Sequence, residues 1–586
     1  MYFRHSQVGR RGARFTAIIA TALALALSGC ASVPTSGPVE HHTQQAPGGS
    51  SGVNVDPLPP ALGAGQLLVV EGFLHAMSNY QPDYAVARQY LTEAASAAWQ
   101  PESAVQIYAD GTLPAENGQT VMLVGPVVGN LDSAGSYLAV SQQLRHDFAL
   151  VRDANEQWRI SNPPDGLLVS RYPFSTGFTP VTLYFMDATG SVLVPDQRYF
   201  ASGEQALTAA ARAVLAGPSA RLAPAVRASS SNPIGVQQVT LNDEGLAEVT
   251  LSSTGLSLGL AERQAMLAEL VTTLSGFAEV NAVTVTVGGV TLANEGGLSE
   301  LSAGDFAELS PDNTAGSRAL FAVAEDGVSR LREDNWLEST PVEADLLKPE
   351  RLAVRSDLTE LAAITDGGSR LVLAPAGTAK ARVLRTGSGL LRPDFARNGE
   401  LWSATSAGVS SFRVYRDDVT VKVDASDLPK HPLVASKLSS DGSRLALVLL
   451  NGTRTEVGVA VVVRAGDGIR LTGWRPLEFN LSAGAAGTAL DLGWASRSQS
   501  TGRWPPADVA VLQRTDAGDT SVIRVSEDGA TATDIGPTKA ASLTRLAVIP
   551  GRPAVALTEG GTAYRFESEF SWALALTAVD DLAYSG

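Results

Sequence analysis

Short apolar runs return at nearly regular intervals along residues 317–586. They begin near Leu320, Leu361, Leu401, Leu445, Val509 and Val555, so that successive starts lie 41, 40, 44, 64 and 46 residues apart. Asn-Gly and Asp-Gly pairs, which favour two-residue hairpin turns, fall among them. A repeat of this length with hairpin turns is typical of a β-propeller, in which each blade is one four-stranded sheet. We therefore expect an all-β propeller of about six blades, with an insertion or an unrecognised blade in the 64-residue interval.

Residues 179–292 mix strand-like and helix-like patterns. The predicted order is a strand over 181–185, a helix over 204–216, a hairpin from 239 to 251, a helix over 261–275 and a strand over 283–287. Gly217-Pro218 ends the first helix, since a flexible residue followed by a helix breaker is a common stop signal. This order predicts a second α+β domain.

Residues 62–174 also predict an α+β domain, with helices first and strands after. Apolar positions spaced as in a helix cover 67–77, and a second helix is expected from Tyr84 to about Trp99. Strand-like runs follow at 105–108, 121–128, 137–140, 148–152 and 158–160. A helical pair followed by a curved antiparallel sheet resembles the cone-shaped NTF2-like folds.

The first 29 residues have the pattern of an export signal. Four arginines and no acid precede the apolar run from Phe15 to Leu27. As a helix this run spans only about 20 Å, too short for a bilayer core of about 30 Å. It is followed by Leu27-Ser28-Gly29-Cys30, which resembles a bacterial lipobox recognised by signal peptidase, so we expect Cys30 to carry a diacylglycerol and an N-linked palmitoyl group.

Residues 30–60 are rich in Pro, Gly, Ser and Gln and predict a flexible tether. A single acyl chain anchors a protein only marginally, whereas two chains anchor it stably. No segment after the signal reaches 18 uninterrupted apolar residues, so no second membrane crossing is expected. We therefore predict a protein attached by lipid to the outer face of the cell membrane.

Charge and composition exclude several classes of function. The chain has 44 basic and 60 acidic residues, a net charge of −16, and cleavage before Cys30 would bring the charge near −20. Nucleic acid is therefore not an expected partner, because phosphate binding needs clustered cations. The single cysteine excludes a disulfide framework and a structural cysteine zinc site.

Motifs for enzymatic chemistry are weak. There is no P-loop, no H-E-x-x-H and no dinucleotide-binding turn after a strand. His41-His42 and the formal G-x-S-x-G match at 48–52 both lie in the tether, without the strand and helix that a nucleophile needs. We expect neither a metal nor another cofactor, and no enzymatic activity.

One enzymatic alternative stays open at the propeller tunnel. Paired carboxylates can cleave glycosidic bonds, and the candidates are Asp357, Asp394 and Asp441, which recur at similar places in successive blades. The competing interpretation is that these aspartates are turn residues. Trp402, Trp474 and Trp494 could bind a glycan or form blade cores, and His431 before Pro432 is expected in a loop.

Three motifs of the middle domain resemble the GerMN domains of spore-germination and envelope proteins. They are Ala213–Pro218, Glu248–Ser252 and Val271–Ser275. The order of lipobox, tether, α+β domain, GerMN-like domain and propeller resembles the actinobacterial LpqB lipoproteins. This resemblance implies an accessory protein that contacts the extracytoplasmic domain of a sensor histidine kinase, that of the Mtr two-component system, and is linked to cell-wall homeostasis and division. The alternatives are a protein that binds or hydrolyses a cell-wall glycan and a purely structural spacer of the envelope.

Overall fold

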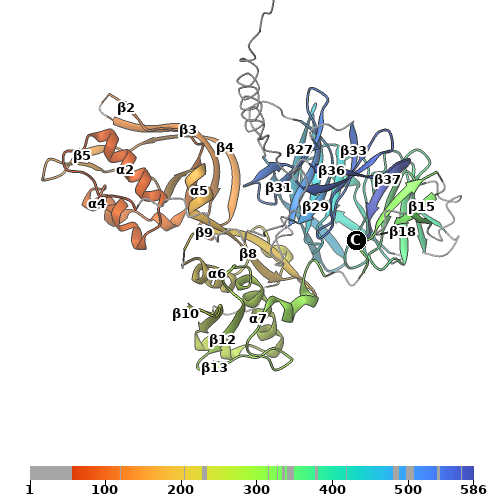
Figure 1. Ribbon diagram of the computed structural model, residues 1–586, viewed down its shortest axis with the longest axis horizontal. Coiled ribbons are helices and arrows are strands. Elements are labelled where there is room, and N and C mark those ends of the chain that lie inside the picture. The colour runs from red at the N-terminus through yellow and green to blue at the C-terminus, as the bar shows by residue number, and fades with distance from the viewer. Residues whose placement is uncertain are drawn as a thin grey trace, which may run out of the picture. The chain divides into compact units, whose positions relative to one another are not determined.

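The structure is a computed structural model. It describes residues 56–118, 120–203, 205–227, 234–313, 316–325, 327–332, 337–339, 349–375, 381–417, 419–478, 487–496, 507–537, 542–568 and 571–586 (Figure 1). Cys30, the preceding Leu27, Ser28 and Gly29, the paired histidines and the G-x-S-x-G match therefore lie outside the described residues. Their predicted roles remain predictions.

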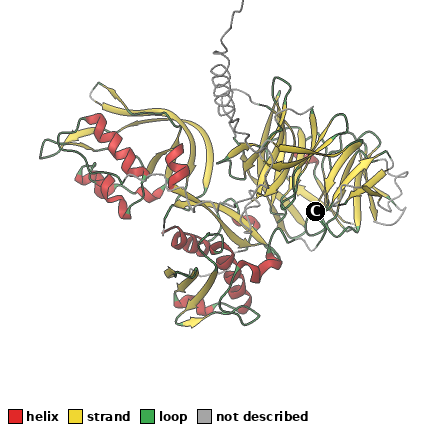
Figure 2. Cartoon of the chain, in the orientation of Figure 1, coloured by secondary structure: helices red, strands yellow, loops and turns green. Residues whose placement is uncertain are grey.

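The first described domain is a curved sheet with helices on its inner side (Figures 1 and 2). Its strands are β1 (Val105–Tyr108), β2 (Ala115–Asn117), β3 (Thr120–Leu131), β4 (Tyr137–Asp147) and β7 (Leu167–Ser170), with β5 (Leu150–Arg152) and β6 (Trp158–Ile160) as a separate ribbon. The helices are α2 (Gln66–Ser78), α3 (Ala85–Arg88), α4 (Glu93–Ala98) and α5 (Arg171–Gly177). Helix α2 buries Val70, Phe73 and Met77 in the core, which confirms the predicted α+β arrangement.

The single helix predicted from Tyr84 to Trp99 is wrong, because the chain leaves the helical conformation between α3 and α4. Leu91 forms a bridge with Ile160 of β6, and the Tyr90 carbonyl accepts a hydrogen bond from the Ile160 amide at 2.9 Å. The Thr92 hydroxyl then caps α4 by accepting from the Ala95 amide at 3.2 Å. Strand pairing and a new N-cap thus override a continuous helical pattern.

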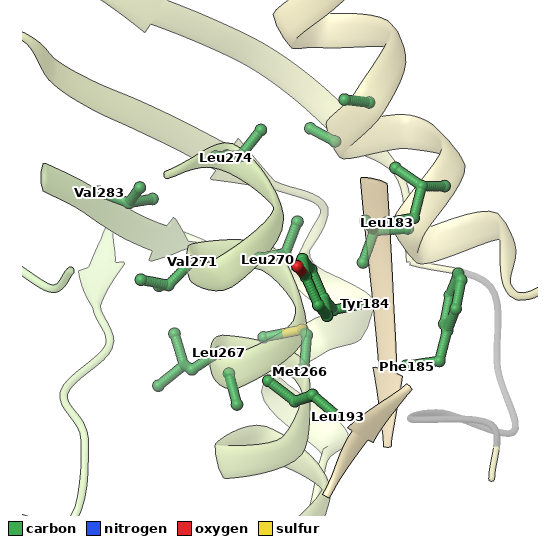
Figure 3. Packing of buried hydrophobic residues seen from close by; sticks show 14 of the residues in the cluster. Leu183, Tyr184, Phe185, Leu193, Met266, Leu267, Leu270, Val271, Leu274 and Val283 are labelled. Atoms are coloured by element: carbon green, nitrogen blue, oxygen red, sulfur yellow. The ribbon is translucent and has the colours of Figure 1, made fainter. Parts of the chain in front are cut away.

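The second domain places two helices against a mixed sheet. Its elements are β8 (Phe178–Met186), β9 (Leu193–Ala201), α6 (Gln205–Ala216), β10 (Val236–Leu241), β11 (Leu246–Leu251), α7 (Leu260–Leu274), β12 (Ala282–Val287) and β13 (Val290–Thr291). The sheet order is β10-β11-β12-β13, with β11 and β12 parallel. Figure 3 shows Met266 and Leu270 of α7 packed beside Tyr184 of β8, with Leu267 and Val271 on the side of α7 that faces Val283 of β12.

Polar side chains of α7 also fix the helix to β8. The Tyr184 amide donates to the Thr273 hydroxyl at 3.1 Å, and the Met186 amide donates to Glu269 Oε1 at 2.8 Å. These bonds satisfy backbone groups of β8 that would otherwise be buried without a partner. Strand β9 was not expected from the sequence, because Pro195, Asp196 and Arg198 interrupt its apolar alternation.

The third domain is a ring of six four-stranded sheets. From the first blade to the sixth, the inner strands are β37 (Val579–Tyr584), β17 (Arg351–Val354), β21 (Asp394–Phe395), β25 (Leu433–Leu438), β29 (Thr488–Ser496) and β33 (Leu543–Ala547). The second strands are β14 (Leu320–Ala324), β18 (Glu360–Thr365), β22 (Leu401–Ser403), β26 (Arg444–Asn451), β30 (Ala507–Arg514) and β34 (Val555–Thr558). Each apolar run predicted from the sequence coincides with one second strand, and the prediction of about six blades is confirmed.

The two outer positions complete each blade. The third strands are β15 (Gly327–Leu331), β19 (Arg370–Pro375), β23 (Arg413–Arg416), β27 (Arg454–Ala465), β31 (Thr520–Ser526) and β35 (Ala563–Ser568). The outer strands are β16 (Leu337–Ser339), β20 (Arg382–Thr386), β24 (Val419–Asp424), β28 (Gly468–Pro476), β32 (Ala532–Asp534) and β36 (Ser571–Leu576). Short 3₁₀ helices lie at Pro82–Tyr84, Pro101–Ser103, Ala223–Ala225, Ser253–Ser257, Ala303–Leu309 and Val409–Ser411.

Two features close and reinforce the ring. The C-terminal strand β37 pairs with β14, so the first blade combines both ends of the domain. Strands β24 and β28 pair in parallel at Val423 and Ile469, which joins the third and fourth blades into one sheet of eight strands. The 64-residue interval holds no further blade among its described residues. It holds the unusually long β27 and β28 instead.

Candidate functional site

The centre of the propeller encloses a cavity of about 180 Å³. Residues from five inner strands and from the segment before β21 line it, and the charged members include Arg351, Arg392, Lys437, Asp491 and Arg545. A propeller tunnel is a common place for ligands and active sites. The groups in this tunnel therefore decide what chemistry the domain can perform.

Three aspartates connect neighbouring blades in the same way. Asp394 Oδ2 accepts from the Leu438 amide at 2.8 Å, which links β21 to β25. Asp491 Oδ2 accepts from the Leu546 amide at 2.8 Å, linking β29 to β33. Asp581 Oδ2 accepts from the Leu352 amide at 2.9 Å, linking β37 to β17. Every second junction between blades therefore has the same kind of hydrogen bond, which a backbone amide donates to an aspartate carboxylate. We call Asp394, Asp491 and Asp581 the aspartate clamps.

Cations occupy the other oxygens of two clamps. Lys437 Nζ pairs with Asp394 Oδ1. Arg392 Nη2 lies 2.6 Å from Asp581 Oδ1, while Arg392 Nη1 donates to the Leu546 carbonyl at 3.0 Å and lies 3.6 Å from Asp491 Oδ2. One guanidinium therefore contacts three successive inner strands across the tunnel.

The remaining oxygen, Asp491 Oδ1, accepts from the Leu492 amide at 3.0 Å. All six oxygens of the clamps therefore accept a hydrogen bond from the protein. Burial raises the pKa of Asp394 and of Asp491, and the nearby cations Lys437 and Arg392 oppose that rise. Burial alone would lower the pKa of Arg392, but Asp581 and Asp491 outweigh it and raise that pKa.

The three aspartates suggested by the sequence are not brought together. Only Asp394 lies on an inner strand, and it is a clamp. Asp357 accepts from the Thr359 amide at 3.0 Å in the turn before β18, and its side chain is 45% exposed. Asp441 accepts from the Ser443 amide at 2.7 Å in the turn before β26. The turn interpretation is correct for Asp357 and Asp441 and wrong for Asp394.

The three tryptophans pack in the cores of blades or between neighbouring blades. Trp402 is buried edge-to-face against Phe412, and the buried Trp494 donates to the Lys437 carbonyl at 3.0 Å. The half-buried Trp474 donates to Glu456 at 3.3 Å. His431 lies in the segment before β25, as expected. Within the part of the chain that the structure describes, no group of three His, Cys, Asp or Glu residues could hold a metal ion.

Asp491, Asp581 and Arg392 were missed by sequence reasoning, although a weak signal was present. The residue before each clamped amide is basic and the amide belongs to leucine, in Arg351-Leu352, Lys437-Leu438 and Arg545-Leu546. This dipeptide repeats in every second blade. The role of this dipeptide could not be recognised from the sequence, because the sequence does not show which strands are innermost.

A second polar cluster joins the GerMN-like domain to the propeller. Arg444 of β26 is buried, its Nε lies 2.6 Å from Glu527 Oε1, and one Nη donates to the Pro195 carbonyl of β9. Arg221 lies 3.1 Å from the same Glu527 oxygen and donates to the Gly473 carbonyl at 2.9 Å. Burial alone would raise the pKa of Glu527, but the two arginines outweigh it and hold that pKa below its ordinary value.

Strand β9 also contacts the first domain, so it touches all three. Tyr199 donates to Asp528 Oδ2 of the propeller at 2.9 Å, and its amide donates to the Gly135 carbonyl of the first domain at 2.9 Å. Arg198 is 1% exposed, pairs with Asp196 at 2.7 Å and donates to the Ala134 carbonyl at 2.8 Å. We call this set of contacts the β9 joint. It fixes three domains through buried polar bonds that tolerate little distortion.

Fold and site together define a class of protein: a three-domain chain with a clamped propeller tunnel and polar joints between domains. No helix in the described residues is both long and apolar enough to cross a membrane. Family models match at residues 59–175 (Lipoprotein LpqB, N-terminal domain), 182–293 (Sporulation and spore germination) and 326–581 (Lipoprotein LpqB beta-propeller domain). The chain is 30% identical to Lipoprotein LpqB of Cutibacterium acnes, over 96% of this chain and 98% of the relative. It belongs to the Lipoprotein LpqB family.

Further similarities were found to a second curated relative and to a solved structure. Lipoprotein LpqB of Thermobifida fusca is 25% identical over 95% of this chain and 97% of its own length. Among solved structures, the first GerMN domain of GerM from Bacillus subtilis is 20% identical, with a TM-score of 0.19, and is matched over 21% of this chain and 95% of its own. Membership of a lipoprotein family implies attachment to the outer face of the membrane.

Proposed function

We propose that this protein is a lipid-anchored accessory protein that modulates a sensor histidine kinase, that of the Mtr two-component system, in the control of cell-wall homeostasis and division. The observation that carries the proposal is family membership along nearly the whole chain, including both LpqB-specific domains. The partner is the one that the family resemblance implies. Diacylation of Cys30 is part of the proposal.

The clamped tunnel favours a binding role over catalysis. A glycosidase needs one carboxyl group free to give up a proton and another free to attack or to activate water. Here all six oxygens of Asp394, Asp491 and Asp581 accept hydrogen bonds from the protein. The same bonds stabilise the inner ring, so the propeller is suited to offer fixed faces to another protein.

The lipid anchor would do most to bring the protein and the kinase together, because it holds the protein at the membrane in which the kinase lies. Two acyl chains contribute about 0.8 kcal/mol for each buried CH₂ group, which confines the protein to the membrane surface. A flexible chain of the length predicted for the tether, 31 residues over 30–60, would have a root-mean-square reach of roughly 30 Å. Tethering over such distances gives effective concentrations on the order of millimolar, so a weak interface is sufficient.

Because of the β9 joint, a partner that contacts one domain would act on all three domains together. Arg444, Glu527 and Arg221 are buried between the middle domain and the propeller, and Tyr199 bonds to both flanking domains. Breaking buried charge pairs is costly, since an unpaired charge is left away from water. A partner bound at the propeller therefore meets a fixed array of domains.

In-cell crosslinking of the full-length protein tests this function. We expect recovery of the kinase sensor domain from wild-type cells and much less from cells with Cys30→Ala, in which the protein leaves the membrane. Equal recovery from both strains would contradict the anchoring mechanism. Recovery of cell-wall glycan without the kinase would favour the glycan-binding alternative.

A further inference from the structure

A groove with a volume of about 800 Å³ lies between the first and sixth blades, and among the described lining residues it shares Tyr584 with the tunnel cavity. Five arginines line it, namely Arg318, Arg330, Arg332, Arg552 and Arg565. No acidic residue is among its described lining residues, although the chain has 60 acidic and only 44 basic residues. A cluster of like charges is unfavourable unless something compensates it. Its presence in an acidic protein therefore calls for an anionic partner.

The arginines of the groove are held to different degrees, and the β15–β16 register places one acidic residue, Glu338, opposite Arg330. Arg318 is held in place, because its Nη1 donates to the Pro550 carbonyl at 2.7 Å and its Nη2 lies 3.8 Å from Asp312 Oδ1. Arg330 and Arg552 are exposed and Arg565 is half-buried. Within the described part of the chain, the side chains of these three make no ion pair or hydrogen bond.

The groove also has an apolar surface. Leu320 and Val555 are buried at its base, and Leu331, Ala575 and Tyr584 pack against the same core cluster while remaining partly accessible. The Tyr584 hydroxyl donates to the Pro553 carbonyl at 2.7 Å, which fixes the ring in this wall. A ligand of this groove would therefore combine carboxylates with apolar groups.

We propose that the groove binds an acidic, partly apolar peptide segment of the kinase sensor domain, an inference that rests on the proposed function. Guanidinium groups bind carboxylates in a bidentate manner and are enriched at protein interfaces. The net charge of −16 repels an acidic segment elsewhere on the surface, so this groove is where such a segment can approach. A flat anionic bilayer fits a concave groove poorly and is repelled by the same net charge.

Charge reversal in the groove tests the proposal on the full-length anchored protein. The variant is Arg330→Glu with Arg552→Glu and Arg565→Glu, none of which removes an observed side-chain bond. The matched control reverses three exposed arginines on other blades, Arg454, Arg470 and Arg514, whose side chains likewise make no observed bond within the described residues. Crosslinked kinase sensor should fall at least tenfold for the groove variant and less than twofold for the control, and unchanged thermal unfolding of both checks folding.

The outcomes separate this inference from the proposed function. If wild-type protein captures the kinase and the groove variant captures it equally, the groove is not the docking site although the function stands. If wild-type protein captures no kinase, the function itself fails, and the inference with it. The chain's own segment 333–348 is acidic and partly apolar, so a crosslink from the groove to that segment in place of the kinase would also overturn the inference.

Discussion

The aspartate clamps predict a severe effect from one substitution at the ring closure, Asp581→Ala. Asp581 lies on β37, the strand that joins the two ends of the propeller, and its side chain is 0% exposed. Its two oxygens accept from Arg392 and from the Leu352 amide. The neighbouring Asp580 is exposed on the same strand, which makes Asp580→Ala a matched control.

The magnitude follows from what the substitution leaves behind. Removing one partner of a buried ion pair costs about 3–5 kcal/mol, and a buried amide left without an acceptor costs about 1–3 kcal/mol. Asp491 remains near Arg392 and reduces the first cost. We therefore expect a loss of about 3–5 kcal/mol for Asp581→Ala and less than about 0.5 kcal/mol for Asp580→Ala.

Hydrogen exchange measured by mass spectrometry suits this test, because a three-domain chain need not unfold in one step. Amides of β37 and β17 should exchange much faster in Asp581→Ala, while those of the first domain should not change. Asp581→Asn keeps an oxygen for the Leu352 amide and should fall between wild type and alanine. Equal protection in Asp581→Ala and Asp580→Ala would refute the clamp reasoning.

Three further predictions concern the anchor, the joint and a close backbone contact. Cys30→Ala should move the protein from the membrane fraction to the soluble fraction with unchanged thermal unfolding, and retention in the membrane would contradict lipidation at Cys30. Because the pKa of Glu527 is depressed, its stabilisation is present above its ordinary value of 4.5 and is lost as pH falls. Glu527→Gln should therefore lower the melting temperature at pH 7, and the melting temperature of this variant should decline less than that of the wild type between about pH 5 and pH 3. Melting temperatures that fall equally with pH in the two proteins would contradict this. Gly135→Ala should destabilise more than Gly111→Ala, since both have φ near +79°, but only at Gly135 would the Cβ meet a backbone oxygen, that of Tyr199 at 2.6 Å. Equal melting temperatures for the two variants would show that the backbone at Tyr199 moves away from the added Cβ at little cost in free energy.

The element order was largely predictable because long periodic segments carry a strong signal. The helix α7 was predicted over 261–275 and is observed at Leu260–Leu274, and six apolar runs gave six second strands. The positions of these elements follow from local patterns of apolar and polar residues, and such patterns can be recognised in the sequence alone.

The parts that sequence reasoning missed depend on distant pairing. Leu91 leaves a helical pattern because Ile160 pairs with it. Strand β9 carries Pro195 and buried charges because its partners lie in three domains, and those partners are unknown from the sequence. Asp491 and Asp581 look like ordinary strand residues until the ring places them beside Arg392. The tunnel is thus defined by tertiary neighbours rather than by a motif.

The most direct test of the proposed function is the level of phosphorylated response regulator in living cells. It should be compared among cells with the wild-type protein, cells with Cys30→Ala and cells without the protein. We predict that Cys30→Ala resembles the deletion, because regulation requires the protein at the membrane beside the kinase. An identical level in all three strains would contradict a role in kinase control.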